Sequence, residues 1–158
     1  MDKEPPAGAS PLIVEEGDAA AQCALGLYYF DKAEIKSEAH PEKDSGNGYC
    51  EWGASWDKAA LGEALKWLTL SAEQDFAEGQ FQLAEAYRSL VEAIDETIDN
   101  NMFYTDHTYG WSELIEDYGF EDVYEYFKLA CKWYKAAIKN GYRSAEKAFA
   151  DLEENLHY

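Results

Sequence analysis

Glu63 to Tyr87 reads EALKWLTLSAEQDFAEGQFQLAEAY, and this stretch decides the fold. Apolar side chains recur in and just before its first half every three or four residues, the spacing of one face of an α-helix. That face consists of Leu61, Ala64, Leu65, Leu68 and Ala72, and Trp67 widens it. Asp75 follows as a turn residue, and a second helix opens after it. The stretch therefore predicts two short antiparallel helices joined by a tight turn.

The same arrangement recurs along the chain. Trp67 and Trp133 lie 66 residues apart, as do the turn residues Asp75 and Gly141, and Gly17 marks a third turn. The other aligned positions are the small residues Ala21, Gly79 and Ala145, the amides Gln22 with Gln80 and Gln74 with Asn140, and the apolar residues Leu25, Leu83 and Phe149. One helix pair cannot bury its own apolar face, so a stack of about three pairs is expected.

At these residues the sequence resembles the Sel-one-like repeats, a branch of the tetratricopeptide-like α/α solenoids. The segments that carry the resemblance are Glu63 to Tyr87, Gly17 to Tyr29 and Ala130 to Gly141. The departures from the family pattern are Asp75 at the turn glycine, Ala84 and Ala150 at the position of Gly26, a first repeat without its Trp, and Glu153 at a tyrosine. The resemblance implies an all-α fold, a short superhelical solenoid that serves as a scaffold for protein interaction. It implies no catalytic residues.

A single domain is expected over residues 1–158. Turn-to-turn separations of 58 and 66 residues exceed a repeat period of roughly 36 residues, which indicates two inserted segments. The expected order is repeat one at about 10–35, an insertion at about 36–56, repeat two at about 57–94, an insertion at about 95–124 and repeat three at about 125–158. The first insertion is interpreted as a loop that the aromatic residues Tyr49, Trp52 and Trp56 pin at one end.

Charge restricts the classes of partner. The chain carries 32 acidic and 13 basic residues, a formal net charge of -19. Such a charge disfavours direct binding to nucleic acid or an anionic membrane and favours one protein partner with a basic surface. A polar N-terminus and the lack of a long apolar run predict a cytoplasmic protein with no membrane association. The three cysteines contain no CxxC pair and predict reduced thiols.

The second insertion has an unusual composition. From Ser89 to Phe127 there are eleven acidic residues, nine aromatic residues and no Lys or Arg. Two interpretations stay open: a solvated acidic helix face with aromatic residues packed inward, or a surface that steers and anchors a basic partner. Under the second interpretation, the candidate protein-binding residues are Tyr104, Tyr109, Trp111, Glu113, Glu116, Asp117 and Tyr118.

Signals for catalysis are weak. The candidates are His107 beside Asp106, Cys50 near His40, and a cation site of Asp95, Glu96 and Asp99. A histidine beside its partner in sequence is seldom oriented by it, the thiol has no recognisable orienting group, and the three carboxylates lack the spacing of a calcium loop. The sequence predicts a protein that is not an enzyme, with no catalytic residues, no metal and no cofactor.

The expected function is therefore non-enzymatic protein–protein interaction. Its sharpest form is an immunity or antitoxin-type protein that neutralises a basic toxin such as a nuclease, because an inhibitor needs tight binding and no chemistry of its own. The alternatives are a general scaffold or assembly adaptor and a β-lactam-type hydrolase. The hydrolase is considered because some secreted, cysteine-rich relatives in the resembled family have been linked to β-lactams.

Overall fold

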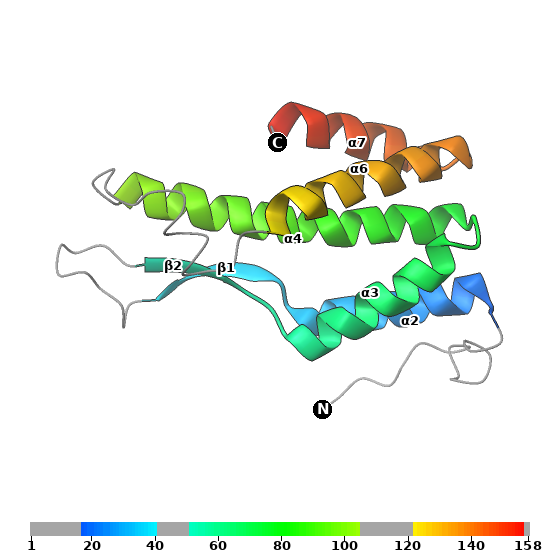
Figure 1. The fold of residues 1–158 in the computed structure, drawn as a ribbon, viewed down its shortest axis with the longest axis horizontal. Helices are drawn as coiled ribbons and strands as arrows, with labels where there is room; N and C mark the ends of the chain where they lie inside the picture. Colours follow the sequence, from blue (N-terminus) through cyan, green and yellow to red (C-terminus); the bar gives the residue numbers. More distant parts are fainter. Residues whose placement is uncertain (1–16, 41–50, 105–121, 157–158) are drawn as a thin grey trace.

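The computed structural model describes residues 17–40, 51–104 and 122–156. Over these residues the chain forms helices and one small sheet (Figure 1). The elements are α2 (Ala19–Ala33), β1 (Lys36–His40), β2 (Glu51–Ser55), α3 (Lys58–Ala72), α4 (Ala77–Tyr104), α6 (Val123–Lys139) and α7 (Ser144–Asn155). The mainly helical character predicted from the apolar periodicity is confirmed. None of the described helices is both long and apolar enough to cross a membrane.

The three turn residues aligned in the sequence share one backbone conformation. Gly17, Asp75 and Gly141 have φ values of 93°, 57° and 86°, in the left-handed region. Glycine enters this region without a steric penalty, and aspartate tolerates it better than most residues. Helices α2, α4 and α7 each begin within three residues of such a turn. The sequence therefore placed all three helix starts correctly.

Two helix–helix interfaces are built alike. Helix α2 packs along α3, and α4 packs along α6. In the first interface Gln74 Nε2 donates to Gln22 Oε1 at 2.6 Å, and in the second Asn140 Nδ2 donates to Gln80 Oε1 at 2.8 Å. These four residues occupy the two pairs of aligned positions found in the sequence. A hydrogen bond between two side-chain amides thus crosses each interface.

Small residues set the helix separation. A methyl group placed on Gly26 would lie 2.6 Å from Cγ of Leu68, and one on Gly79 would lie 2.3 Å from Oγ of Ser71. Both distances are far below van der Waals contact, so no larger side chain fits without displacing its neighbour. The Ser71 hydroxyl also donates to the Ala19 carbonyl at 2.7 Å. Gly79 is one of the small residues at the aligned positions, and the structure shows a close approach of the two helices there.

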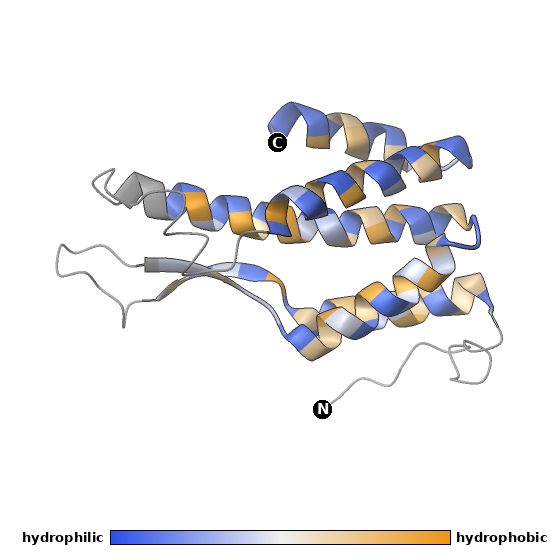
Figure 2. Cartoon of the chain, in the orientation of Figure 1, coloured by the Kyte–Doolittle hydropathy of each residue, from blue (hydrophilic) through white to orange (hydrophobic). Residues whose placement is uncertain are grey.

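Apolar side chains line the contacts between helices. Leu83 and Tyr134 are fully buried and Leu25 nearly so, whereas Phe149 is half-buried. Figure 2 shows that hydrophilic and hydrophobic residues both occur along the described helices, as expected when only one face of each helix is covered. Trp67, which widens the apolar face predicted from the sequence, and Trp133 at the matching position are both only half-buried. A lysine ammonium lies over each of their indole rings.

The first inserted segment is not simply a loop, and that interpretation was wrong. Strands β1 and β2 pair antiparallel, with Lys36 opposite Ser55 and His40 opposite Glu51. The hairpin lies on α4, where Ser37 Oγ and Thr97 Oγ1 are 2.6 Å apart. Glu34, with a φ of 48°, ends α2 and turns the chain toward β1. A two-stranded ribbon is marginal alone, so the surface of α4 is what stabilises it.

Repeat two was expected to end at about residue 94, but helix α4 continues to Tyr104. Its 28 residues span about 42 Å at 1.5 Å per residue. Val91, Ile94 and Ile98 are buried, so the extension keeps the helical apolar spacing that begins in the repeat. The extension carries the helix from the repeat into the acidic segment as one continuous element.

The close approach at Gly26 makes a stability prediction. Gly26→Ala should lower the free energy of unfolding by about 1 to 2 kcal/mol, because overpacking against Leu68 exceeds the gain in helix propensity. Gly62→Ala is the matched control, since Gly62 also lies within a helix but has open space around it. That change should stabilise the protein by about 0.5 to 1 kcal/mol. Denaturant unfolding of both variants measures this, and equal effects would contradict the packing argument.

Candidate protein-binding surface

Of the residues predicted for partner binding, Tyr104 is the last residue of α4. The others lie outside the described residues: Tyr109, Trp111, Glu113, Glu116, Asp117 and Tyr118. His107 and Cys50 also lie outside them, and His40 is the last residue of β1. Helix α4 is therefore the described element that leads directly into the predicted site.

Helix α4 carries a row of carboxylates on its exposed side. Four of them recur every seven residues, which returns to nearly the same side of a helix, and a fifth lies between the last two. We call this row the acidic stripe: Glu78, Glu85, Glu92, Glu96 and Asp99. All are exposed except Glu85, which is half-buried. The stripe extends about 31 Å along the helix axis and ends five residues before Tyr104.

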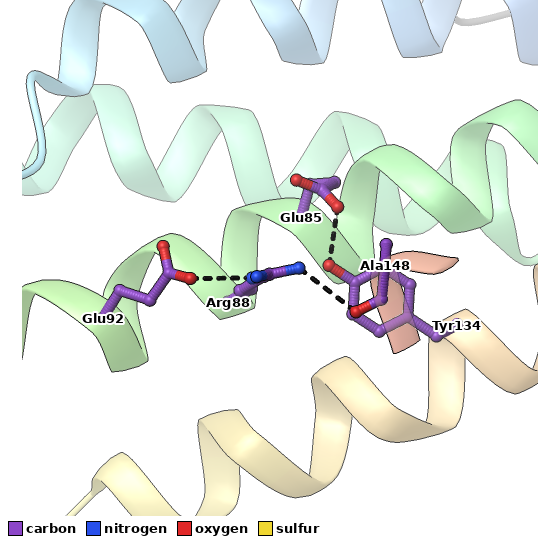
Figure 3. Close-up of polar contacts among 5 residues, drawn as sticks. All are labelled: Glu85, Arg88, Glu92, Tyr134 and Ala148. Atoms are coloured by element: carbon purple, nitrogen blue, oxygen red, sulfur yellow. Dashed lines mark hydrogen bonds and ion pairs between the residues drawn. The ribbon is translucent and has the colours of Figure 1, made fainter. Parts of the chain in front are cut away.

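A polar network fixes the middle of this stripe (Figure 3). The Tyr134 hydroxyl on α6 donates to Glu85 Oε1 at 2.6 Å. Arg88 Nε donates to Glu92 Oε1 at 2.7 Å, and Arg88 Nη1 donates to the Ala148 carbonyl of α7 at 3.1 Å. Two carboxylates of the stripe are thus held by groups from α4 and α6, and Arg88 also ties α4 to α7. Fixed carboxylates lose less side-chain entropy when a partner binds.

The network also shifts the titration of its members. Burial raises the pKa of the Tyr134 hydroxyl well above its ordinary value, and the hydrogen bond to Glu85 raises it further. Burial alone would lower the pKa of the Arg88 guanidinium, but its bonds to Glu92 and Tyr134 outweigh burial and raise it. Arg88 is therefore a permanent cation and Tyr134 a neutral donor throughout the physiological range.

Two of the surface clefts formed by the described residues lie beside the helices. The larger, about 490 Å³, lies where α2 begins and α3 ends, and its lining residues are Gly17, Gln22, Lys66, Trp67, Leu70, Glu73 and Gln74. The smaller, about 370 Å³, is lined by Leu27, Phe30, Asp31, Glu34, Ile35 and Ser89. The larger cleft is of ordinary ligand-site size. The Trp67 indole offers an apolar face for stacking, and Gln22, Lys66, Glu73 and Gln74 offer polar groups.

The two described cysteines are poor nucleophiles. Burial raises the pKa of the Cys23 thiol to about 12, with a further contribution from Glu78. Burial also raises the pKa of Cys131. The thiolate is the reactive form, so both groups stay protonated and unreactive near neutral pH. Among the described residues no three His, Cys, Asp or Glu side chains form a group that could hold a metal, so Asp95, Glu96 and Asp99 do not form the cation site considered from the sequence.

Comparison of the chain with protein-family models, with curated proteins and with solved structures finds no match.

The sequence prediction missed two of the five residues of the acidic stripe. It drew attention to the acidic residues from position 89 onward, but Glu78 and Glu85 lie earlier, within the predicted repeat. The seven-residue spacing of Glu78, Glu85, Glu92 and Asp99 was visible in the sequence and could have identified the face.

The Tyr134–Glu85 bond makes a prediction about alkaline pH. A pKa raised by folding adds stability that is complete below the ordinary tyrosine value near 10 and is lost as pH rises toward the folded value. The melting temperature should fall above about pH 10, and Tyr134→Phe should make this fall shallower. At neutral pH the same change should cost about 1 kcal/mol for the lost hydrogen bond.

Thermal melts from about pH 7 to 11.5 test this. The upper limit lies roughly one to two units above the ordinary tyrosine pKa. Tyr124→Phe is the control, because Tyr124 is an exposed tyrosine on the same helix. If Tyr134→Phe and Tyr124→Phe give the same pH profile, the buried hydroxyl does not control alkaline stability.

Proposed function

We propose that this chain is a non-catalytic protein-binding module, a short solenoid of Sel-one-like repeats whose acidic surface holds one partner protein with a basic surface. The observation that carries the proposal is the acidic stripe of α4, which continues into the segment with the predicted binding residues. The matched amide pairs at the α2–α3 and α4–α6 interfaces support the repeat architecture. The poorly nucleophilic thiols of Cys23 and Cys131 favour binding over catalysis.

Electrostatics explains how the surface works. Helix α4 carries six carboxylates and one arginine, and the whole chain has a net charge of -19. A continuous row of like charge accelerates encounter with an oppositely charged patch and turns it toward the row. The aromatic residues predicted at Tyr104, Tyr109 and Trp111 would then supply apolar contact area that slows dissociation.

The partner class that fits best is a basic toxin such as a nuclease, which makes the chain an immunity or antitoxin-type protein. A nuclease site is basic because it holds phosphates, and a row of carboxylates, two of which are held in place, can occupy it as a substitute. A general scaffold or assembly adaptor would use the same surface with a different basic partner. The two differ in whether the partner is harmful when it is free.

Charge-neutral variants test the surface. Glu92→Gln, Glu96→Gln and Asp99→Asn together should slow association with the basic partner on the order of tenfold at low salt, and a further triple change at Glu113, Glu116 and Asp117 should slow it more. The control neutralises three exposed acidic residues of α7, Glu146, Glu153 and Glu154, which removes the same charge elsewhere. Surface plasmon resonance at several salt concentrations measures both sets.

If both sets of variants bind the partner alike at every salt concentration, the stripe is a solvated face and the proposed site is wrong.

Co-expression distinguishes the two partner classes. The chain is expressed together with the product of the adjacent gene in a susceptible host, and survival is scored. The immunity function predicts that the neighbour kills alone and that this chain restores growth, while the α4 triple variant restores it less. If the neighbour is harmless alone, or kills equally with and without this chain, the immunity function is wrong and the scaffold function is the one that stands.

A further inference from the structure

Helix α6 carries a basic surface within this strongly acidic protein. Four of the chain's 13 basic residues lie on it, against one glutamate, Glu125, which pairs with Lys128 at 2.7 Å. We call the four the lysine stripe: Lys128, Lys132, Lys135 and Lys139. Their spacing of three and four residues confines them to one side of the helix, an arc of about 60°. All four are exposed. The buried residues of α6, including Ala130 and Tyr134, occupy the opposite side and pack toward α4.

Aromatic rings underlie most of this stripe. The ammonium group of Lys128 lies 4.8 Å from the ring centre of Tyr124, and that of Lys132 lies 4.7 Å from Trp133. Lys135 lies 5.6 Å from the ring of Phe149 on α7. Tyr124 is itself 51% exposed. These contacts hold the lysine side chains near aromatic rings, and the exposed Tyr124 ring adds apolar contact area beside them.

We propose that the lysine stripe binds an acidic, extended peptide segment of a partner protein. Successive lysines of the stripe are about 4.5 to 6 Å apart along the helix axis. Alternate side chains of an extended peptide are about 6.6 Å apart on one face, so acidic residues at every second position can each meet a lysine. With Tyr124 included, the stripe is about 22 Å long, which matches a segment of about seven residues.

The charge of the rest of the molecule selects a short peptide over a nucleic acid. A polynucleotide extends beyond the stripe and meets the surrounding acidic surface, including six carboxylates on the neighbouring helix α4. A peptide of seven residues ends where the lysines end. This site is separate from the basic-partner surface of α4, so the failure of either proposal leaves the other intact.

The experiment measures binding of a fluorescein-labelled peptide with glutamate at every second position over about seven residues, followed by fluorescence anisotropy at low salt. The test variant carries Lys132→Gln, Lys135→Gln and Lys139→Gln. The control carries Lys36→Gln, Lys58→Gln and Lys147→Gln, which remove the same charge from β1, α3 and α7. Circular dichroism of both variants checks that they fold.

The wild type and the control triple should bind the peptide alike, and the stripe triple should bind about tenfold more weakly, as expected for three exposed ion pairs. In the wild type, a titration followed by amide NMR shifts should place the largest changes on α6. Equal loss in both triples, or shifts elsewhere, would show attraction to net charge alone and overturn the proposal. The proposal would also be overturned if a thymidine oligonucleotide of equal charge bound more tightly than the peptide. Self-association of the wild type that the stripe triple abolishes would overturn it as well.

Discussion

The contact of Gly26 with Leu68 is the constraint on which the arrangement of α2 and α3 depends. The two helices approach until the leucine side chain lies only 2.6 Å from the place where a Cβ atom on Gly26 would stand. The Gln22–Gln74 hydrogen bond fixes their relative position along the axis. At the aligned positions of the α4–α6 interface, Ala84 and Tyr134 are fully buried in one cluster. At this interface alanine takes the place of glycine and tyrosine takes the place of leucine, while the hydrogen bond between two amides is kept.

This packing determines which residues face solvent. Once one side of each helix is committed to its neighbour, the charged residues must occupy the remaining side, because burying an unpaired charge costs far more than any contact returns. On α4 that side collects carboxylates, and on α6 it collects lysines. Arg88 is the exception, with its side chain only 19% exposed, and it is satisfied by Glu92 and by the Ala148 carbonyl. The charge pattern of the surface is thus a consequence of the helix pairing.

The sequence predicted the features that depend on local pattern and failed where tertiary contacts decide. The turns at Gly17, Asp75 and Gly141 follow from residue type and spacing. The alignment identified the four amide residues as matching positions, and the structure shows that they bond in pairs. The hairpin was missed because its strands are short and gain stability from α4, as the Ser37–Thr97 contact shows. The expected boundary near residue 94 assumed a fixed repeat length. That assumption ended the helix too early, because the apolar spacing of α4 continues through Ile98.

For the candidate surface, the total charge was a poor guide to local charge. A net charge of -19 led to the expectation of a basic partner, and the same total obscured four lysines at helical spacing on α6. Neighbouring helices of opposite sign attract across their shared interface, which offsets part of the self-repulsion of so acidic a chain. They also leave two surfaces of opposite sign on one small molecule. A partner that meets both surfaces can bind in only one orientation, because turning it over would place like charges together at both sites.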